Sequence, residues 1–266
     1  MGQVGADLEF VVLGPLEVRR GGAALQIATR RQRALMLLLL LNVGRPVPAE
    51  RLIDQLWDGN PPPQAGVTLR SYVSTLRQAL GGREGGGAAL ATRGQGYVLD
   101  VSAEAIDATR FTALVEQGRA RLRAGGAAEA LAAFEAAGEL WLGDPYAEIA
   151  DHDVAQAVRT QLTEVHLGAV EGRFEALLAC GRHLDATAQL ESFVAEPPLR
   201  EAPRAQLMLA LYRGGRAAEA LEVYRKFREL VAEELGIDPG VALETLQRKI
   251  LQQDPDLDAP PATAPR

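Results

Sequence analysis

A short pattern that returns at a fixed spacing constrains the fold of this chain most. Residues 181–193 (GRHLDATAQLESF) align with residues 215–227 (GRAAEALEVYRKF) at a displacement of 34 positions, and residues 125–137 (GGAAEALAAFEAA) contain the same AAEAL block. Each copy has a glycine turn, then small alanines, then a bulky residue. A 34-residue period is typical of tetratricopeptide repeats, in which helix pairs stack on one another. We therefore predict an all-α repeat region, against the alternative that an alanine-rich sequence repeats by chance.

The first hundred residues predict a different architecture. The expected elements are, in order, a small antiparallel sheet at 8–27, helices at 30–44, 46–59 and 68–80, a flexible glycine-rich loop at 81–89 and a hairpin at 90–101. This order is that of a winged helix-turn-helix. The predicted fold is mainly α: an N-terminal α+β winged helix-turn-helix domain (1–103), an all-α tetratricopeptide-like domain (104–253) and a proline-rich, disordered tail (254–266).

The predicted third helix, TLRSYVSTLRQAL at 68–80, has two distinct sides. Helical spacing gathers its apolar residues on one side, as in a helix packed against a core. Arg70, Ser74 and Arg77 stack on another side, with Ser71 and Gln78 beside them. Two interpretations stay open from this helix alone: an ordinary solvated face, or the recognition helix of a nucleic-acid-binding protein.

Charge is distributed unevenly along the chain. The net charge of −7 divides into +3 for residues 1–101 and −10 for the rest. Lysine occurs only at 226 and 249, so arginine provides almost all of the positive charge. The planar guanidinium suits phosphates and guanine edges. A modest positive charge permits nucleic-acid binding by the first part without proving it.

The sequence contains no pattern of residues that indicates an enzyme. The single cysteine, Cys180, excludes an internal disulfide framework, and no GxxxxGK[ST] phosphate-binding loop occurs. The three histidines are far apart, so we predict no catalytic residues, no cofactor and no metal site. The longest apolar run, ALMLLLLL at 34–41, is too short to span a bilayer. We expect a soluble, cytoplasmic protein without a membrane partner.

The motifs of both parts together resemble one known family. Residues 8–22, 30–44, 51–62, 68–80 and 91–101 are similar to successive motifs of the OmpR/PhoB-type winged helix in the Streptomyces antibiotic regulatory protein family. Residues 198–240 are similar to the family's bacterial transcriptional activator domain, and the resemblance extends from about residue 8 to 257. It implies a sequence-specific, DNA-binding transcriptional activator, pathway-specific for antibiotic biosynthesis and nucleoid-associated.

The resemblance also implies which residues contact double-stranded DNA. They are Thr68, Arg70, Ser71, Ser74 and Arg77 on the third helix, and Arg93 in the wing. Family members bind direct repeats side by side, which implies a homodimer on DNA, and they contact RNA polymerase. We place the polymerase contact in the loop at 57–64. This chain departs from the family at Thr75 and Gln78, where a basic residue is common, and in its glycine-rich loop.

A function of another class also fits the predicted fold. Stacked helix pairs form concave surfaces that hold proteins. The chain could therefore be an adaptor that binds partners through its repeats, with no specific reading of DNA. Basic groups on both the third helix and the wing distinguish the two hypotheses, because an adaptor does not need them.

Overall fold

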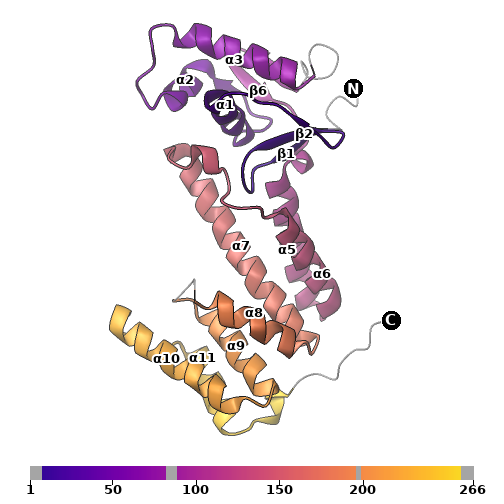
Figure 1. Cartoon of the computed structure of the whole chain (residues 1–266), viewed down its shortest axis with the longest axis vertical. Helices are drawn as coiled ribbons and strands as arrows, with labels where there is room; N and C mark the ends of the chain where they lie inside the picture. Colours follow the sequence, from indigo (N-terminus) through magenta and orange to yellow (C-terminus); the bar gives the residue numbers. More distant parts are fainter. Residues whose placement is uncertain (1–7, 82–88, 196–198, 259–266) are drawn as a thin grey trace. The chain divides into compact units, whose positions relative to one another are not determined.

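The computed structural model describes residues 8–81, 89–195 and 199–258 (Figure 1). Its elements in chain order are β1 (Leu8–Val11), β2 (Glu17–Arg20), β3 (Ala23–Leu25), α1 (Arg30–Leu40), β4 (Val47–Pro48), α2 (Ala49–Leu56), α3 (Ala65–Ala79), β5 (Leu90–Arg93), β6 (Gly96–Leu99), η1 (Ala103–Ala105), α5 (Asp107–Arg123), α6 (Ala127–Leu140), η2 (Ala147–Ile149), α7 (Asp153–Ala179), α8 (His183–Phe193), α9 (Glu201–Arg213), α10 (Ala217–Leu235), α11 (Val241–Leu251) and η3 (Pro255–Leu257). The predicted fold class is confirmed, since a small β-containing winged part precedes an all-α part.

The chain forms two compact units, and each unit is made of two separate stretches of the sequence. One comprises Met1–Ala113 with Ala137–His166, and the other Leu114–Ala136 with Leu167–Arg266. We call them the winged unit and the repeat unit. Helices α5, α6 and α7 each contribute residues to both units. The domain boundary at 103/104 stays a prediction.

Two small sheets and three helices form the winged part of the winged unit. Strands β1, β2 and β3 pair antiparallel in that order, with Phe10 opposite Val18, and both side chains are buried. The second sheet has the order β4-β6-β5, so the hairpin β5–β6 extends from the short strand before α2.

Helix α1 forms the centre of the winged unit. It begins with a capping box, in which the Gln32 amide donates to the Thr29 hydroxyl at 3.3 Å and the Thr29 amide donates to the Gln32 side chain at 3.4 Å. Every residue from Leu35 to Leu40 is buried. A helix that is apolar on all sides must be enclosed by other elements. Strand β6 and helices α2, α3 and η2 contact it.

The winged unit also includes segments that follow the wing by up to 67 residues, since the wing ends at Leu99 and the unit at His166. The Asp107 carboxylate is 2% exposed and accepts hydrogen bonds from the amides of Val12, at 2.9 Å, and Leu13, at 3.1 Å. The amides of Leu142 and Tyr146 donate to the carbonyls of Leu13 and Val12. The loop after β1 is therefore paired with the chain beyond the predicted boundary.

The repeat unit shows the predicted helix pairs. The three copies of the repeated block begin α6, α8 and α10, and each follows a glycine with positive φ: Gly125 (79°), Gly181 (75°) and Gly215 (75°). Glycine adopts this conformation without a steric penalty, so it ends one helix and allows the next to turn back. Helix α9 packs against both α8 and α10 (Figure 1).

The tail predicted to be disordered begins with an ordered turn. Residues 254–258 include η3, where the Asp254 carboxylate accepts from the Asp256 amide at 3.0 Å, and Leu257 is buried. Residues 259–266 lie outside the described residues. The same is true of 82–88, which make up most of the glycine-rich loop predicted to be flexible.

Candidate nucleic-acid interface

Helix α3 begins three residues earlier than its periodicity predicts, at Ala65 instead of Thr68. The prolines at 61–63 precede it, and a proline cannot continue a helix from the preceding turn because it lacks an amide proton. The helix buries Leu69, Val73 and Leu76, each 1% exposed, against the winged core. This apolar side, which the sequence predicts, fixes which side chains point outward.

The outward side of α3 is centred on four residues. Val67 is 55% exposed, and Ser71, Ser74 and Gln78 are exposed as well. At about 100° per residue these four side chains fall within about 60° of one another, opposite the buried residues. We call Val67, Ser71, Ser74 and Gln78 the outward stripe. Two of them, Ser71 and Ser74, belong to the set implied by the resemblance to contact DNA.

Two more residues of that set lie on the flanks of the outward stripe. Thr68 is half-buried, and its hydroxyl donates to the Gln64 carbonyl at 3.2 Å. Arg70 is exposed, and its guanidinium lies over Gly66 in the first turn of α3. Among the described residues, no hydrogen bond or ion pair engages the Arg70 side chain. Its charge is therefore available to a ligand at the start of the helix.

The structure places Arg77 differently from the other residues of the set. Its Nε donates to the Leu90 carbonyl at 2.8 Å, and Nη2 donates to the Thr92 hydroxyl at 2.7 Å. The guanidinium carbon also lies 6.0 Å from the centre of the Tyr97 ring. Arg77 thus connects α3 to both strands of the hairpin, and its donors are largely directed inward.

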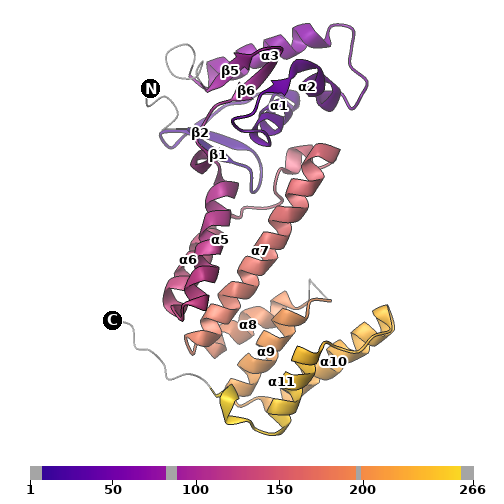
Figure 2. The same cartoon turned by 180° about the vertical axis from the view of Figure 1, so that it is seen from behind.

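The hairpin β5–β6 forms the wing beside α3 (Figure 2). Arg93 pairs with Gly96 across a two-residue turn in which Gly94 has a φ of 57°. A side chain at Gly96 would overlap the Val47 carbonyl of β4, so this position needs glycine. Arg93 is exposed at the tip of the wing and has no side-chain partner among the described residues.

Two contacts that hold α3 in place were not found from the sequence. Arg20 of β2 donates to the carbonyl of Leu80 at the C-terminal end of the helix, where a cation also complements the helix dipole. Trp57, which follows α2, stacks on Tyr72 with ring centres 6.5 Å apart, and the Arg31 guanidinium lies 5.5 Å from Trp57. Neither contact has a local sequence signal, because its partners are distant along the chain.

The surface formed by α3 and the wing contains no described carboxylate. The described residues of 59–81 and 89–99 include Arg70, Arg77 and Arg93 but no aspartate or glutamate. A surface of this composition attracts anions, and in the part of the chain that the structure describes no ion pair engages Arg70 or Arg93.

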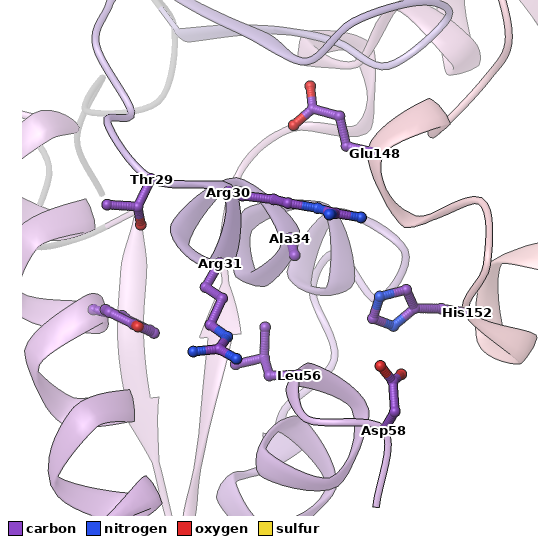
Figure 3. A pocket seen from close by; sticks show the side chains of 9 residues that line it. Thr29, Arg30, Arg31, Ala34, Leu56, Asp58, Glu148 and His152 are labelled. Carbon is purple, nitrogen blue, oxygen red and sulfur yellow. The ribbon is translucent and has the colours of Figure 1, made fainter. Parts of the chain in front are cut away.

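A hollow of about 520 Å³ lies in the same unit and is lined in part by Tyr72 of α3 (Figure 3). It is lined by Thr29, Arg30, Arg31, Ala34, Leu56, Asp58, Tyr72, Glu148 and His152. Figure 3 shows the Asp58 carboxylate directed toward the His152 ring. The positive charges of two arginines in this lining are balanced by the negative charges of two carboxylates. The hollow therefore has no excess charge with which to select a ligand.

Comparison with known proteins identifies the family. Residues 106–251 match the family described as bacterial transcriptional activator domain, and residues 25–99 match the C-terminal domain of transcriptional regulatory proteins. The regulatory protein DnrI of Streptomyces peucetius is 36% identical over 258 residues, which cover 94% of this chain and 94% of DnrI. The chain belongs to the Streptomyces antibiotic regulatory protein family of transcriptional regulators.

Other members of the family are longer than this chain. The regulatory protein AfsR of Streptomyces griseus is 40% identical over 253 residues, covering 95% of this chain but only 25% of AfsR. The solved structure of Mycobacterium tuberculosis EmbR, in complex with a low affinity phosphopeptide, is 36% identical and superposes with a TM-score of 0.87, covering 94% of this chain and 66% of EmbR. This chain thus corresponds to the shared winged and repeat parts of those relatives.

Family membership concerns the class of protein and adds no catalytic or metal site to the described residues. The family that the chain matches, and its relative DnrI, are regulators of transcription rather than enzymes. Over the described residues, no three His, Cys, Asp or Glu side chains group as metal ligands do, and none of the helices has the length and apolarity needed to cross a membrane.

Proposed function

We propose that this chain is a cytoplasmic, nucleoid-associated activator that binds double-stranded DNA with α3 in the major groove and the wing against the flanking backbone. The absence of described carboxylates from α3 and the wing is the observation that supports this proposal most. The order of α2, the connecting loop and α3 is also that of a helix-turn-helix, whose second helix enters the groove.

The residues divide into three roles in this proposal. Ser71 and Ser74 face the bases, Thr68 and Arg70 approach a phosphate near the start of α3, and Arg93 contacts the backbone beside the wing. Arg77 acts as a positioning residue, because its bonds to Leu90 and Thr92 set the wing relative to α3.

The proposal is tested by removing the two unpaired arginines. Arg70→Ala and Arg93→Ala should each weaken binding to a cognate duplex at moderate salt while leaving the melting temperature unchanged, because neither side chain has a partner among the described residues. Arg225→Ala in α10 is the matched control, since that exposed arginine is paired with Glu222 and Glu229. If no duplex is bound and the repeats alone capture a protein partner, the adaptor hypothesis replaces this one.

The loop between α2 and α3 is the proposed contact with RNA polymerase. Residues 58–64 are exposed and contain three consecutive prolines, which limit the conformations of the loop before any partner binds. Replacing the prolines at 61–63 by serines should reduce transcription from a target promoter and leave DNA affinity intact. Loss of both activities would instead place the loop in the DNA-binding surface.

Binding to direct repeats as a homodimer on DNA is the remaining part of the proposal. Two copies in one orientation should prefer half-sites about one helical turn apart, roughly 10 base pairs, so that both α3 helices meet the same side of the duplex. Moving one half-site by about five base pairs should abolish cooperative binding. Chromatin immunoprecipitation would then show whether the bound promoters belong to antibiotic biosynthesis genes.

A further inference from the structure

The outward stripe differs from the rest of the interface because it contains no charged side chain. Val67, Ser71, Ser74 and Gln78 offer an isopropyl group, two hydroxyls and a carboxamide. Arg70 lies outside the stripe, with its guanidinium over Gly66. Arg77 is also outside it, and its hydrogen bonds go to Leu90 and Thr92 of the wing. The centre of the proposed reading surface therefore lacks the guanidinium that most often recognises guanine.

The chemistry of the stripe suits adenine and thymine. A glutamine carboxamide can donate to N7 and accept from the N6 amino group of adenine, which is a two-bond contact. An aliphatic side chain in the major groove packs against the C5 methyl group of thymine. The hydroxyls of Ser71 and Ser74 both donate and accept, so they fit any of the four bases.

We propose that Val67 and Gln78 determine the specificity of α3 for a half-site that contains a thymine and an adenine. Val67 contacts the thymine methyl group, and Gln78 binds the major-groove edge of the adenine. This inference rests on the proposed function, because it assumes that α3 enters the major groove.

The length of the helix limits how far apart these two bases lie. Val67 and Gln78 are eleven residues apart, which corresponds to about 16 Å at 1.5 Å per residue. Base pairs follow one another every 3.4 Å along the duplex axis. The thymine and adenine are therefore separated by at most about five base pairs.

The experiment starts by selecting duplexes from a random library with the complete chain. In the selected half-site, each thymine is replaced in turn by uracil, which lacks the methyl group, and each adenine by 7-deazaadenine, which lacks N7. Affinity is measured for the unaltered protein, Val67→Ala and Gln78→Ala. Val241→Ala, also strongly exposed at 77%, and Gln161→Ala, in α7, are matched controls.

The proposal expects one sensitive position for each analogue. Uracil at one position should weaken binding about three- to fivefold, the effect of one methyl group, and Val67→Ala should be insensitive to that replacement. 7-Deazaadenine at another position should weaken binding about 5- to 100-fold, with Gln78→Ala insensitive to it. The control variants should respond to both analogues as the unaltered protein does.

Two results would overturn the inference, and they are distinguishable. If selected duplexes bind tightly but Val67→Ala and Gln78→Ala respond to every analogue as the unaltered protein does, other residues read the bases and the proposed function stands. If the folded chain selects no sequence at all, the proposed function fails together with this inference.

Discussion

Arg225 on the repeat unit and two arginines on the α3 and wing surface of the winged unit have opposite surroundings. In α10, Arg225 is paired with Glu222 and Glu229, each at 2.6 Å. On α3 and the wing, Arg70 and Arg93 have no such partner among the described residues. Both groups are exposed, so exposure does not distinguish them. An arginine without an acid partner can bind a phosphate without first breaking an ion pair.

The two units also differ in the contacts that stabilise them. Beside its apolar core, the winged unit has polar contacts between segments about 95 positions apart, such as Asp107 with Val12. The repeat unit is stabilised mainly by packing between neighbouring helices, as stacked repeats are, and its polar contacts connect segments that are nearer in sequence, such as Arg213 with Leu257. Substitutions that interrupt one kind of contact should therefore affect one unit and spare the other.

The largest effect is expected for Asp107→Ala in the winged unit. Burial raises the pKa of Asp107, while hydrogen bonds from the amides of Val12, Leu13 and Ala108 oppose that rise. Alanine would leave three backbone donors without an acceptor, so the free energy of unfolding should fall by about 3 kcal/mol. Denaturant unfolding followed by tryptophan fluorescence of Trp57 and Trp141 would measure the change.

Asp100→Ala is the matched control for this substitution. Asp100 is exposed, and its carboxylate accepts no hydrogen bond among the described residues, so its loss should change stability little. Equal destabilisation by both variants would mean that the buried carboxylate does not hold the β1 loop to α5.

Gly172→Ala should have the next largest effect, in the repeat unit. Phe134 of α6 lies between Gly118 of α5 and Gly172 of α7, and a Cβ atom at Gly172 would come within 2.5 Å of its ring. Overpacking of this kind costs about 1–3 kcal/mol. Thermal unfolding should show the loss, and adding Phe134→Leu should restore part of it.

Gly138→Ala provides the comparison for this prediction. Gly138 is also in a helix, but a Cβ atom there would meet nothing within 4 Å. Because alanine is the better helix former, stability should rise by up to about 1 kcal/mol. A loss of stability at both positions would show that crowding of the Phe134 ring is not the reason why Gly172→Ala is destabilising.

A smaller effect is expected for Glu148→Gln. Glu148 accepts from Arg33 at 2.6 Å and from the Leu16 amide at 3.0 Å. Burial alone would raise the pKa of Glu148, but these hydrogen bonds and the Arg33 charge outweigh it and lower the pKa. The contribution to stability is therefore present above the ordinary pKa of 4.5 and is lost as the pH falls below it.

At neutral pH, Glu148→Gln should destabilise the winged unit by about 1–2 kcal/mol, because the pair is only partly buried. The difference from the unaltered protein should shrink in unfolding experiments at pH 4 and below. A difference that does not change between pH 7 and pH 3 would exclude the ionised carboxylate as its source.

The sequence predicts the elements of the fold better than it predicts the contacts of individual polar groups. The apolar side of α3, the wing turn at Gly94 and the glycines before α6, α8 and α10 follow from local rules, and the structure has them where expected. The orientation of Arg77 does not follow from such rules. Its acceptors belong to residues 90 and 92, and only the tertiary structure brings them within reach.

The same dependence on tertiary structure explains why the sequence does not predict Val67 as an outward residue of α3. The periodic pattern begins at Thr68, so the helix start at Ala65 and the outward position of Val67 depend on how the prolines end the preceding loop. Likewise, nothing local to Asp107 indicates that its carboxylate binds amides about 95 positions earlier.

The dependence of DNA affinity on salt tests the central claim most directly. The slope of log K against log salt is negative, and each phosphate contact that is removed should reduce its magnitude by about 0.9. We therefore expect Arg70→Ala and Arg93→Ala each to make the slope less negative by about one, and Arg225→Ala to leave it unchanged. Equal slopes for all three variants and the unaltered protein would contradict the claim that the unpaired arginines of α3 and the wing bind the DNA backbone.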